Sequence, residues 1–518
     1  MKILFTGFFP AWMIHFVSEL DFIESHLVAG DEVSLLVCNA DLRACECNRY
    51  HSLPVCAKCI GRRQHGVSLL SKPIKMLSLA EDFPVPPIIP KNLLSIEQLK
   101  KITIDGFDIG EGIYSSLIDR CMSTHPDVRK ERRVIRAMAR DSYRVWKTAI
   151  TALSSEKYDR VYIYNGRFCT TRAWVRACQG MKVPFYTHER SMKLDRIFLV
   201  NGAIPHDPTT YHSRIIAFLE ATKGDQAVRQ EGVDYFEEKP KGKNSAWKVF
   251  VRRQNKTELP QDWNPHRRNI VFFASTEREF VGVKQFTPPG IYDSQIDAIL
   301  DLFPRAVAED PSIQFYLRVH PNSWREKIRW WESAAFTSIS NLCIIPPESS
   351  VSTYELMHSC EKCLCFRSSM GIESTYWGKP SIALTYAFYA GLDAVYEPKT
   401  RKEALDLILS VLSPKPRDNA IKFGSFLRRG GRALEHSTAT LDLGKLLFKG
   451  TELQSHPGIT ERISRPFGIG KLPRISGALN RGMELLWWIR AKVKFRNWFA
   501  AAPLCRHAIG FDFHPKRY

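Results

Sequence analysis

The strongest chemical pattern in this chain is a run of small and polar residues, FRSSMGIESTYWGKP, at positions 366–380. Small residues at the start of a helix leave its free N–H groups open to an anion, so Ser368, Ser369 and Gly371 fit a phosphate site. Glu373, one helical turn further on, could accept hydrogen bonds from ribose hydroxyls. The pattern predicts the nucleotide half of a sugar-nucleotide site, although a plain helix start in any α/β domain can look similar.

A second segment, LRVHPN at positions 317–322, precedes that run. Transfer of a group from a nucleotide donor needs positive charge or hydrogen bonds on the departing phosphate. Arg318 can supply a bidentate guanidinium and His320 an imidazole N–H, so both are predicted phosphate contacts. The alternative for His320 is a structural histidine at the end of a strand.

The sequence STERE at 275–279 follows an apolar stretch, 269–274, that we expect to be a buried strand. At the carboxyl end of that strand, Thr276, Glu277 and Glu279 would approach the donor. The same residues also fit a helix capping box, with Thr276 at the N-cap and Glu279 three residues later.

Two further polar groups end predicted strands in the first half of the chain, NGR at 165–167 and HER at 188–190. Ligands of open α/β sheets bind at the carboxyl ends of the strands, so both groups should line a substrate cleft. Asn165 and Arg167 are therefore predicted to hold the acceptor or its phosphate.

Removal of a proton from an acceptor hydroxyl needs a base. Glu189 is one candidate, because Arg190 beside it would keep the carboxylate ionised if the two pair. His15, just after the first predicted strand, is the other candidate. Glu189 could instead form a buried ion pair, and His15 could be a helix residue that faces solvent or core. A retaining mechanism would need no such base.

Apolar strands alternate with helical stretches through both halves, which predicts an α/β protein with parallel sheets. We expect a first domain at 1–245, a linker at 246–268, a second domain at 269–440 and a basic, aromatic tail at 441–518. The linker lies in a stretch rich in Lys, Pro, Asn and Gln. Two doubly wound, Rossmann-like domains would then face each other across a cleft.

Cysteines cluster in a segment at 38–65 that we expect to be an insert of the first domain. The spacing of Cys56 and Cys59 suits a tetrahedral metal held by a tight turn. Cys38 and Cys45 would complete a structural zinc site. Alternative ligands are Cys47, His51 and His65. An iron–sulfur cluster and unligated thiols are the other interpretations.

The 518-residue chain has a formal net charge of +20, which suits phosphate-bearing substrates or an anionic membrane surface. It carries no nucleic-acid-binding motif, so we expect no nucleic-acid partner. No apolar run reaches the roughly 18 residues that a spanning helix needs. The start of the chain lacks a signal-peptide cleavage pattern, which predicts a reducing, cytoplasmic location for the 13 cysteines.

The tail at 441–518 has 14 Lys and Arg against five Asp and Glu, and it contains the sequence LLWWIR. Tryptophan beside basic residues favours a membrane interface, so we expect peripheral contact with the inner face of the plasma membrane. The alternative is a packed C-terminal helix with solvated lysines.

The quoted segments resemble the donor half of GT-B glycosyltransferases, and more narrowly a cysteine-containing subgroup of bacterial capsule and surface-polysaccharide transferases. The resemblance rests on R-x-H-P at 318–321 and S-x-x-G-x-E…G-K-P at 368–380, with support from the cysteine insert. It implies transfer of a sugar from a CMP-, UDP- or GDP-linked donor to a glycan or lipid-linked acceptor, without a catalytic metal. The His-Pro and Ser-Ser pairing also resembles sialyltransferases, in which these residues bind the CMP phosphate.

Other functions fit parts of the same pattern. A sugar-nucleotide 2-epimerase shares the architecture and the G-x-E…G-K-P helix, and a polyol-phosphate transferase of the same fold is a further alternative. A basic nucleic-acid- or membrane-binding scaffold would explain the charge but would not need Glu373. Binding of a nucleotide separates the enzymes from the scaffold.

Overall fold

The computed structural model describes residues 1–79, 83–242, 251–283, 290–326, 329–440 and 445–454. The predicted tail at 441–518 lies outside these residues except for 445–454. In the part of the chain that is described, no helix is long and apolar enough to cross a membrane.

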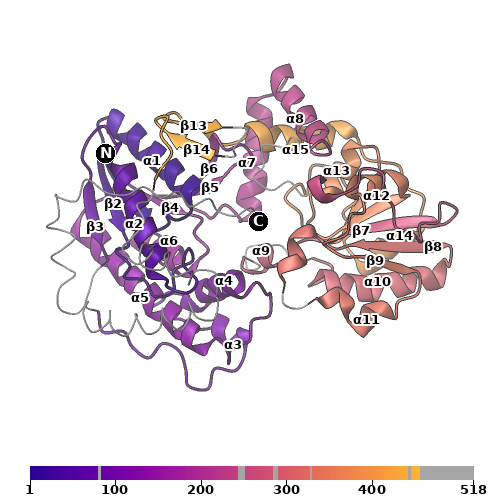
Figure 1. Cartoon of the computed structure of the whole chain (residues 1–518), viewed down its shortest axis with the longest axis horizontal. Helices are drawn as coiled ribbons and strands as arrows, with labels where there is room; N and C mark the ends of the chain where they lie inside the picture. Colours follow the sequence, from indigo (N-terminus) through magenta and orange to yellow (C-terminus); the bar gives the residue numbers. More distant parts are fainter. Residues whose placement is uncertain (80–82, 243–250, 284–289, 327–328, 441–444, 455–518) are drawn as a thin grey trace, which may run out of the picture.

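The first domain is built on a seven-stranded sheet with the order β12-β6-β5-β4-β1-β2-β3 (Figure 1). Its strands are β1 (Lys2–Gly7), β2 (Glu32–Val37), β3 (Lys75–Ser78), β4 (Arg160–Tyr164), β5 (Phe185–Arg190), β6 (Arg196–Asn201) and β12 (Arg432–Ala433). The first five are mutually parallel, β6 runs antiparallel to β5, and the edge strand β12 runs antiparallel to β6. The predicted parallel sheet is therefore confirmed, with two antiparallel pairings added at one side.

Helices cover this sheet and form much of its core. They are α1 (Met13–Val28), α2 (Leu53–Ser68), α3 (Ile96–Lys100), α4 (Ile109–Cys121), α5 (Arg132–Ser155) and α6 (Cys169–Met181). The last three pack against one another. In α5, Ile135, Met138 and Ala139 repeat at helical spacing and are buried, while arginines occupy the opposite side.

The second domain has a fully parallel five-stranded sheet with the order β11-β10-β7-β8-β9. Its strands are β7 (Arg268–Phe273), β8 (Ile313–Arg318), β9 (Leu342–Ile345), β10 (Lys362–Cys365) and β11 (Ser381–Ala383). Its helices are α9 (Arg278–Val281), α10 (Gln295–Glu309), α11 (Ala334–Thr337), α12 (Thr353–Ser359), α13 (Met370–Tyr376) and α14 (Arg401–Leu409). Phe303 of α10 stacks on Phe315 of β8 with ring centroids 3.9 Å apart.

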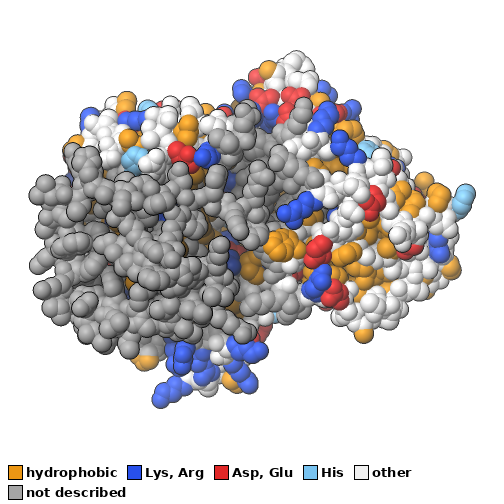
Figure 2. Space-filling view, in the orientation of Figure 1, with side chains coloured by type: hydrophobic (Ala, Val, Ile, Leu, Met, Phe, Trp, Pro, Cys, Tyr) orange, Lys and Arg blue, Asp and Glu red, His pale blue; other side chains and the backbone are white. Residues whose placement is uncertain are grey.

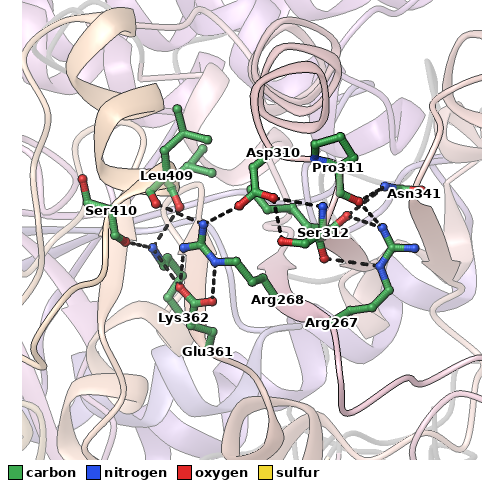
Figure 3. Close-up of polar contacts among 12 residues, drawn as sticks. Arg267, Arg268, Asp310, Pro311, Ser312, Asn341, Glu361, Lys362, Leu409 and Ser410 are labelled. Carbon is green, nitrogen blue, oxygen red and sulfur yellow. Dashed lines mark hydrogen bonds and ion pairs between the residues drawn. The ribbon is translucent and has the colours of Figure 1, made fainter.

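Charged residues at the amino ends of these strands bind one another (Figure 3). Arg268 pairs with Asp310 at 2.7 Å and with Glu361 at 2.8 Å. The fully buried ammonium of Lys362 donates to the carbonyl oxygens of Leu407, Ile408 and Ser410 at the end of α14. Because these charged groups satisfy one another's hydrogen bonds, we infer that this edge of the sheet stabilises the domain.

A third core joins the two domains. It combines Phe198 of β6 and Ile372 of α13 with residues of α7 (Pro208–Ala221), α8 (Gln226–Glu238) and α15 (Arg417–Arg429). Phe426 of α15 lies at its centre, with its ring against those of Phe198, Tyr211 and Phe218. Helices from both sides of the expected linker therefore pack together.

After α15 the chain returns to the first domain, which the expected division at 269–440 did not include. β12 pairs with β6, and β13 (Ser437–Thr440) and β14 (Lys445–Phe448) lie against α1. Buried acids of α1 hold this segment: Asp21 accepts hydrogen bonds from the backbone N–H groups of Glu435 and His436, and Glu24 pairs with Lys449 at 2.6 Å. Two Rossmann-like α/β domains, the predicted GT-B architecture, are thus connected by two crossings of the chain.

Candidate active site

The carboxyl edge of the second sheet brings together the loops after β7, β8 and β10. Thr276 Oγ1 lies 3.0 Å from His320 Nδ1, and the backbone N–H of Asn322 donates to the same nitrogen at 3.1 Å. A nitrogen that accepts these bonds carries no proton, which places the proton of the neutral imidazole on Nε2. The predicted residues Thr276 and His320 therefore form one unit.

Glu277 is a carboxyl group with an unusual environment in this unit. Its side chain is partly buried, and Oε1 accepts a hydrogen bond from the backbone N–H of Gln295 at 2.9 Å. Burial raises the pKa of Glu277 to about 7, against the opposing effects of that hydrogen bond and of Arg367. The group can therefore carry or release a proton near neutral pH.

The start of α13 is held by packing as well as by its sequence. A Cβ on Gly371 would come within 2.3 Å of Tyr389 Oη and 2.5 Å of Cys365 Sγ, so only glycine lets the helix approach β10 this closely. The carbonyl of Ser368 accepts a hydrogen bond from Tyr389 Oη at 2.6 Å, and Ser368 Oγ accepts from Met370 N. These contacts fix the predicted phosphate turn.

Glu373 is occupied by protein groups rather than open to a ribose. Its Oε1 accepts from Lys239 Nζ at 2.6 Å and from Ser369 Oγ at 2.7 Å, and its Oε2 accepts from Tyr354 Oη at 2.6 Å. Burial alone would lower the pKa of Lys239, but Glu373 and Tyr235 raise it, so the ammonium stays charged. Glu373 thereby ties α13 to the end of α8, a contact that the sequence did not predict.

Arg318 also differs from its predicted role as a phosphate contact. Its Nη1 donates to the carbonyl of Pro346 at 2.7 Å and its Nη2 to that of Ser349 at 3.2 Å, both in the loop after β9. Burial lowers the pKa of this guanidinium to about 10. In this arrangement Arg318 braces a loop. Glu279 lies in α9, but its side chain is outside the described part of the structure.

The carboxyl edge of the first sheet holds Glu189. Asn165 Nδ2 donates to its Oε2 at 2.6 Å, and the backbone N–H of Arg190 donates to its Oε1 at 3.1 Å. Burial opposes ionisation, but these hydrogen bonds and the positive charge that His15 and His206 acquire at acidic pH outweigh it, so the pKa of Glu189 is lowered. The carboxylate is ionised at neutral pH and oriented by Asn165, which the sequence had assigned to the acceptor.

His15 lies beside this carboxylate, with its Nδ1 3.9 Å from Glu189 Oε1 and its Nε2 3.2 Å from Tyr164 Oη. Burial lowers the pKa of His15 to about 4, so the ring is neutral. His188, the residue before Glu189 on β5, bonds instead to the buried Glu19 at 3.1 Å. The two predicted bases are therefore neighbours, and Glu189 is the charged one.

Arg167 is oriented by α4. Its Nη1 donates to Ser115 Oγ at 2.9 Å and its Nη2 to Asp119 Oδ2 at 2.6 Å. His206, from the loop after β6, lies close enough to Arg167 and Glu189 to interact with both charges, and its pKa is lowered to about 4, first by burial. The sequence analysis missed His206, because it ends no strand and belongs to no recognisable pattern.

The two carboxyl edges meet at the segment 275–283. Arg278 Nη1 lies 2.9 Å from Met122 Sδ, and Val283 is buried in the core of the first domain. A Cβ on Gly282 would stand 2.8 Å from Ser115 Oγ and 3.4 Å from Arg167 Nη1, which explains why glycine is needed here. The loop that carries Thr276 and Glu277 thus reaches the residues that follow β4.

The cysteine segment follows β2. Cys45 lies close enough to Cys38, Cys47, Cys56 and Cys59 to affect their ionisation, and burial raises the pKa of Cys59 to about 12. Among the described residues, no three His, Cys, Asp or Glu side chains form a group that could hold a metal. The geometry as it stands therefore does not form a zinc site, and zinc remains a prediction from the spacing.

No protein-family model and no curated protein sequence matches the chain. Solved structures do show similarity. A KpsC β-Kdo 2,4-transferase from Thermosulfurimonas dismutans is 15% identical, covering 56% of this chain and 84% of that chain, with a TM-score of 0.36. A UDP-GlcNAc 2-epimerase from Neisseria meningitidis, bound to UDP-GlcNAc, is 14% identical and covers 82% and 98%, with a TM-score of 0.28.

Proposed function

We propose that this chain is a GT-B glycosyltransferase that moves a sugar from a nucleotide-sugar donor to a glycan or lipid-linked acceptor. The observation that carries the proposal is the meeting of the two carboxyl edges at the segment 275–283. The segment that follows Thr276 and Glu277 thereby reaches Ser115 and Arg167 of the domain that carries Glu189. Two domains that present different polar side chains at facing edges suit a reaction between two substrates.

In the proposed reaction, the donor phosphate lies near His320, Thr276 and Glu277, and the acceptor lies near Glu189. The acceptor hydroxyl oxygen forms a bond to the anomeric carbon, and the bond from that carbon to the phosphate oxygen breaks. The electron pair leaves with the phosphate, where the Nε2–H of His320 would stabilise it. The hydroxyl proton passes to Glu189. This assignment favours inversion at the anomeric carbon.

A sugar-nucleotide 2-epimerase is the second candidate, because Glu277 has a pKa of about 7. A carboxyl group that gains and loses a proton near neutral pH suits proton transfer at a sugar carbon. Incubation with UDP-GlcNAc in the absence of any acceptor distinguishes the two. Appearance of the 2-epimer would favour this candidate over the transferase.

The test of the transferase is a thermal-shift screen with CMP, UDP, GDP and dTDP on three proteins: the wild type, His320→Ala and His266→Ala. A ligand of the folded state raises its apparent stability. We expect one nucleotide class to stabilise the wild type and His266→Ala, since His266 is exposed in the same domain, and to lose most of its effect in His320→Ala. Glu373→Ala is a poor choice, because it would leave Lys239 buried without its carboxylate. No shift with any nucleotide would contradict the proposal.

The predicted structural zinc is a separate proposal that no step of this reaction needs. Metal analysis of the purified protein tests it. Stoichiometric zinc, lost in Cys56→Ser, would support the four-cysteine site, and metal-free protein of normal stability would contradict it.

A further inference from the structure

A recess in the first domain is not accounted for by the residues discussed so far. Its cavity volume is about 80 Å³, which is below the roughly 300 Å³ of a typical small-ligand site, so the recess can hold one part of a larger ligand. Its lining residues are Trp12, Cys45, Glu46, Arg49, Ser116, Asp119, Arg120, Met138 and Phe168. They come from the start of α1, the cysteine segment, α4, α5 and the residue before α6.

One wall of the recess is aromatic and fixed in place. The Trp12 ring stacks on Phe9 with centroids 5.2 Å apart and stands 5.9 Å from the Phe168 ring. Phe168 is itself buried beneath the Arg167 guanidinium. A rigid indole offers an apolar face to the C–H side of a sugar ring, while the sugar hydroxyls need polar partners around the rim.

Glu46 supplies a carboxyl group from the cysteine segment. Its oxygens accept hydrogen bonds from Ser116 Oγ at 3.0 Å, Thr170 Oγ1 at 3.2 Å and Cys169 Sγ at 3.3 Å. Burial raises the pKa of Glu46 against these hydrogen bonds. The group is oriented by α4 and α6.

Two guanidinium groups of the recess have no acidic partner among the described residues. Arg49 Nη2 is 3.4 Å from Met122 Sδ, and Arg120 lies over the Tyr50 ring at 5.7 Å. The other acid of the lining, Asp119, pairs with Arg167 at 2.6 Å. The recess therefore has a positive rim that a negative ligand group would balance.

Two lining residues of the recess contact residues of the candidate active site. Asp119 orients Arg167, and the Trp12 ring stands 6.2 Å from that of His15, the neighbour of Glu189. A ligand that stacks on Trp12 would thus lie near His15, which in turn adjoins the proposed base.

We propose that this recess binds one anionic glycosyl unit of the acceptor, with its ring on Trp12 and its negative group between Arg49 and Arg120. The proposal rests on the transferase function, since it places the acceptor rather than the donor. The negative group is a sugar carboxylate or a sugar phosphate, and both would meet the same two guanidinium groups.

Titrations followed by saturation-transfer NMR on the full chain test the recess. The probes are D-glucuronate, α-D-glucose 1-phosphate, methyl α-D-glucoside and inorganic phosphate. We expect one of the two anionic sugars to bind about tenfold more tightly than the neutral glucoside, and the Arg49→Gln/Arg120→Gln double variant to lose that preference. Glucuronate as the better ligand indicates a carboxylated sugar, and glucose 1-phosphate indicates a phosphate.

Matched variants separate the recess from general charge and from folding. Arg133→Gln removes an exposed positive charge from α5 and should leave the preference unchanged. Trp12→Leu should weaken all three sugars but not inorganic phosphate. Far-UV and near-UV circular dichroism checks that each variant is folded. Because Arg49 is exposed, its replacement alone should not disturb folding, so the single variant Arg49→Gln provides a second test.

Two results would overturn the proposal: equal binding of the neutral and anionic sugars, or binding of inorganic phosphate as tight as that of glucose 1-phosphate. The same samples are titrated with the nucleotide found by thermal shift. Sugar binding without nucleotide binding would sink the transferase but leave the recess as a saccharide site. Nucleotide binding without sugar binding would sink the recess alone.

Discussion

Glu189 and Glu277 both lie at the carboxyl edge of a parallel sheet, Glu189 near the end of β5 and Glu277 in the loop after β7, yet the two carboxyl groups differ in their pKa. Glu189 receives hydrogen bonds from Asn165 and a backbone N–H and has a lowered pKa. Glu277 receives one backbone hydrogen bond, and burial raises its pKa to about 7. Environments that push two carboxyl groups apart in pKa assign one as base and the other as proton carrier.

The same type of fold therefore gives its two glutamates opposite electrostatic environments. In the first domain, hydrogen-bond donors surround Glu189 and keep it ionised. In the proposed reaction this charge faces the neutral hydroxyl group of the acceptor. In the second domain, Glu277 receives a single backbone hydrogen bond, so it can be neutral when the phosphate of the proposed donor lies nearby.

Replacement of Glu189 by Gln should have the largest effect. It keeps the shape and the contact with Asn165 but removes the base, so we expect kcat/KM to fall about 1,000-fold with little change in nucleotide affinity. Transfer assays and thermal shifts on the same preparation measure the two quantities. Glu220→Gln, on the exposed side of α7, is the control. A parallel loss of nucleotide affinity would show that Glu189 does not act on the acceptor alone.

Glu277 should make nucleotide affinity depend on pH. Its pKa is about 7, so it is neutral below pH 7 and negative above, where it would repel the donor phosphates. We expect affinity to fall about tenfold between pH 6 and pH 8 in the wild type, beyond the ionisation of the nucleotide itself. Glu277→Gln should bind with the wild-type affinity at pH 6 and keep it at pH 8. An identical pH profile in the variant would remove Glu277 from the donor site.

The same residue should also affect stability. A carboxyl group whose folded-state pKa is raised from 4.5 to about 7 binds its proton more tightly in the native state. Its contribution to the free energy of unfolding is therefore intact below pH 4.5 and is lost as the pH rises towards 7. We expect Glu277→Gln to recover about 3 kcal/mol relative to wild type over that window, measured by urea unfolding. A constant difference across the window would contradict the raised pKa.

His206 should have the smallest effect of the four. Burial keeps it neutral at pH 7, so its influence on Glu189 there comes from packing rather than charge. We expect His206→Gln to lower kcat/KM about fivefold without changing the pH profile between 6 and 8. A shift of the acidic limb of that profile would show that His206, and not Glu189 alone, controls proton transfer.

The sequence predicted the parts of the site that depend on where a strand ends. Thr276, His320, Asn165 and Glu189 all follow predicted strands, and the parallel sheets bring them to the expected edges. Contacts made by segments distant in the sequence were not predictable. Lys239 forms an ion pair with Glu373 across the domain junction, and residue type and spacing do not predict this tertiary contact.

Arg318 illustrates the second limit. The residue type suited a phosphate, but the side chain is buried and its donors are satisfied by the loop after β9. Likewise, α1 reads as an ordinary amphipathic helix, and nothing in its sequence indicates that Asp21 and Glu24 bind the segment after α15. A buried polar residue indicates that a hydrogen-bonding or ion-pair partner exists, but it does not show which part of the chain provides that partner.

The return of the chain to β12 has a consequence for biosynthesis. Synthesis runs from the N-terminus, and domains generally fold in that order as they emerge. The first sheet, however, lacks its edge strand until residues 432–433 are made, and the buried acids of α1 lack their partners until residues 435–449 are made. The first domain must therefore wait, partly open, while the whole second domain is translated, and that interval is when a nascent chain of this kind would most need a chaperone.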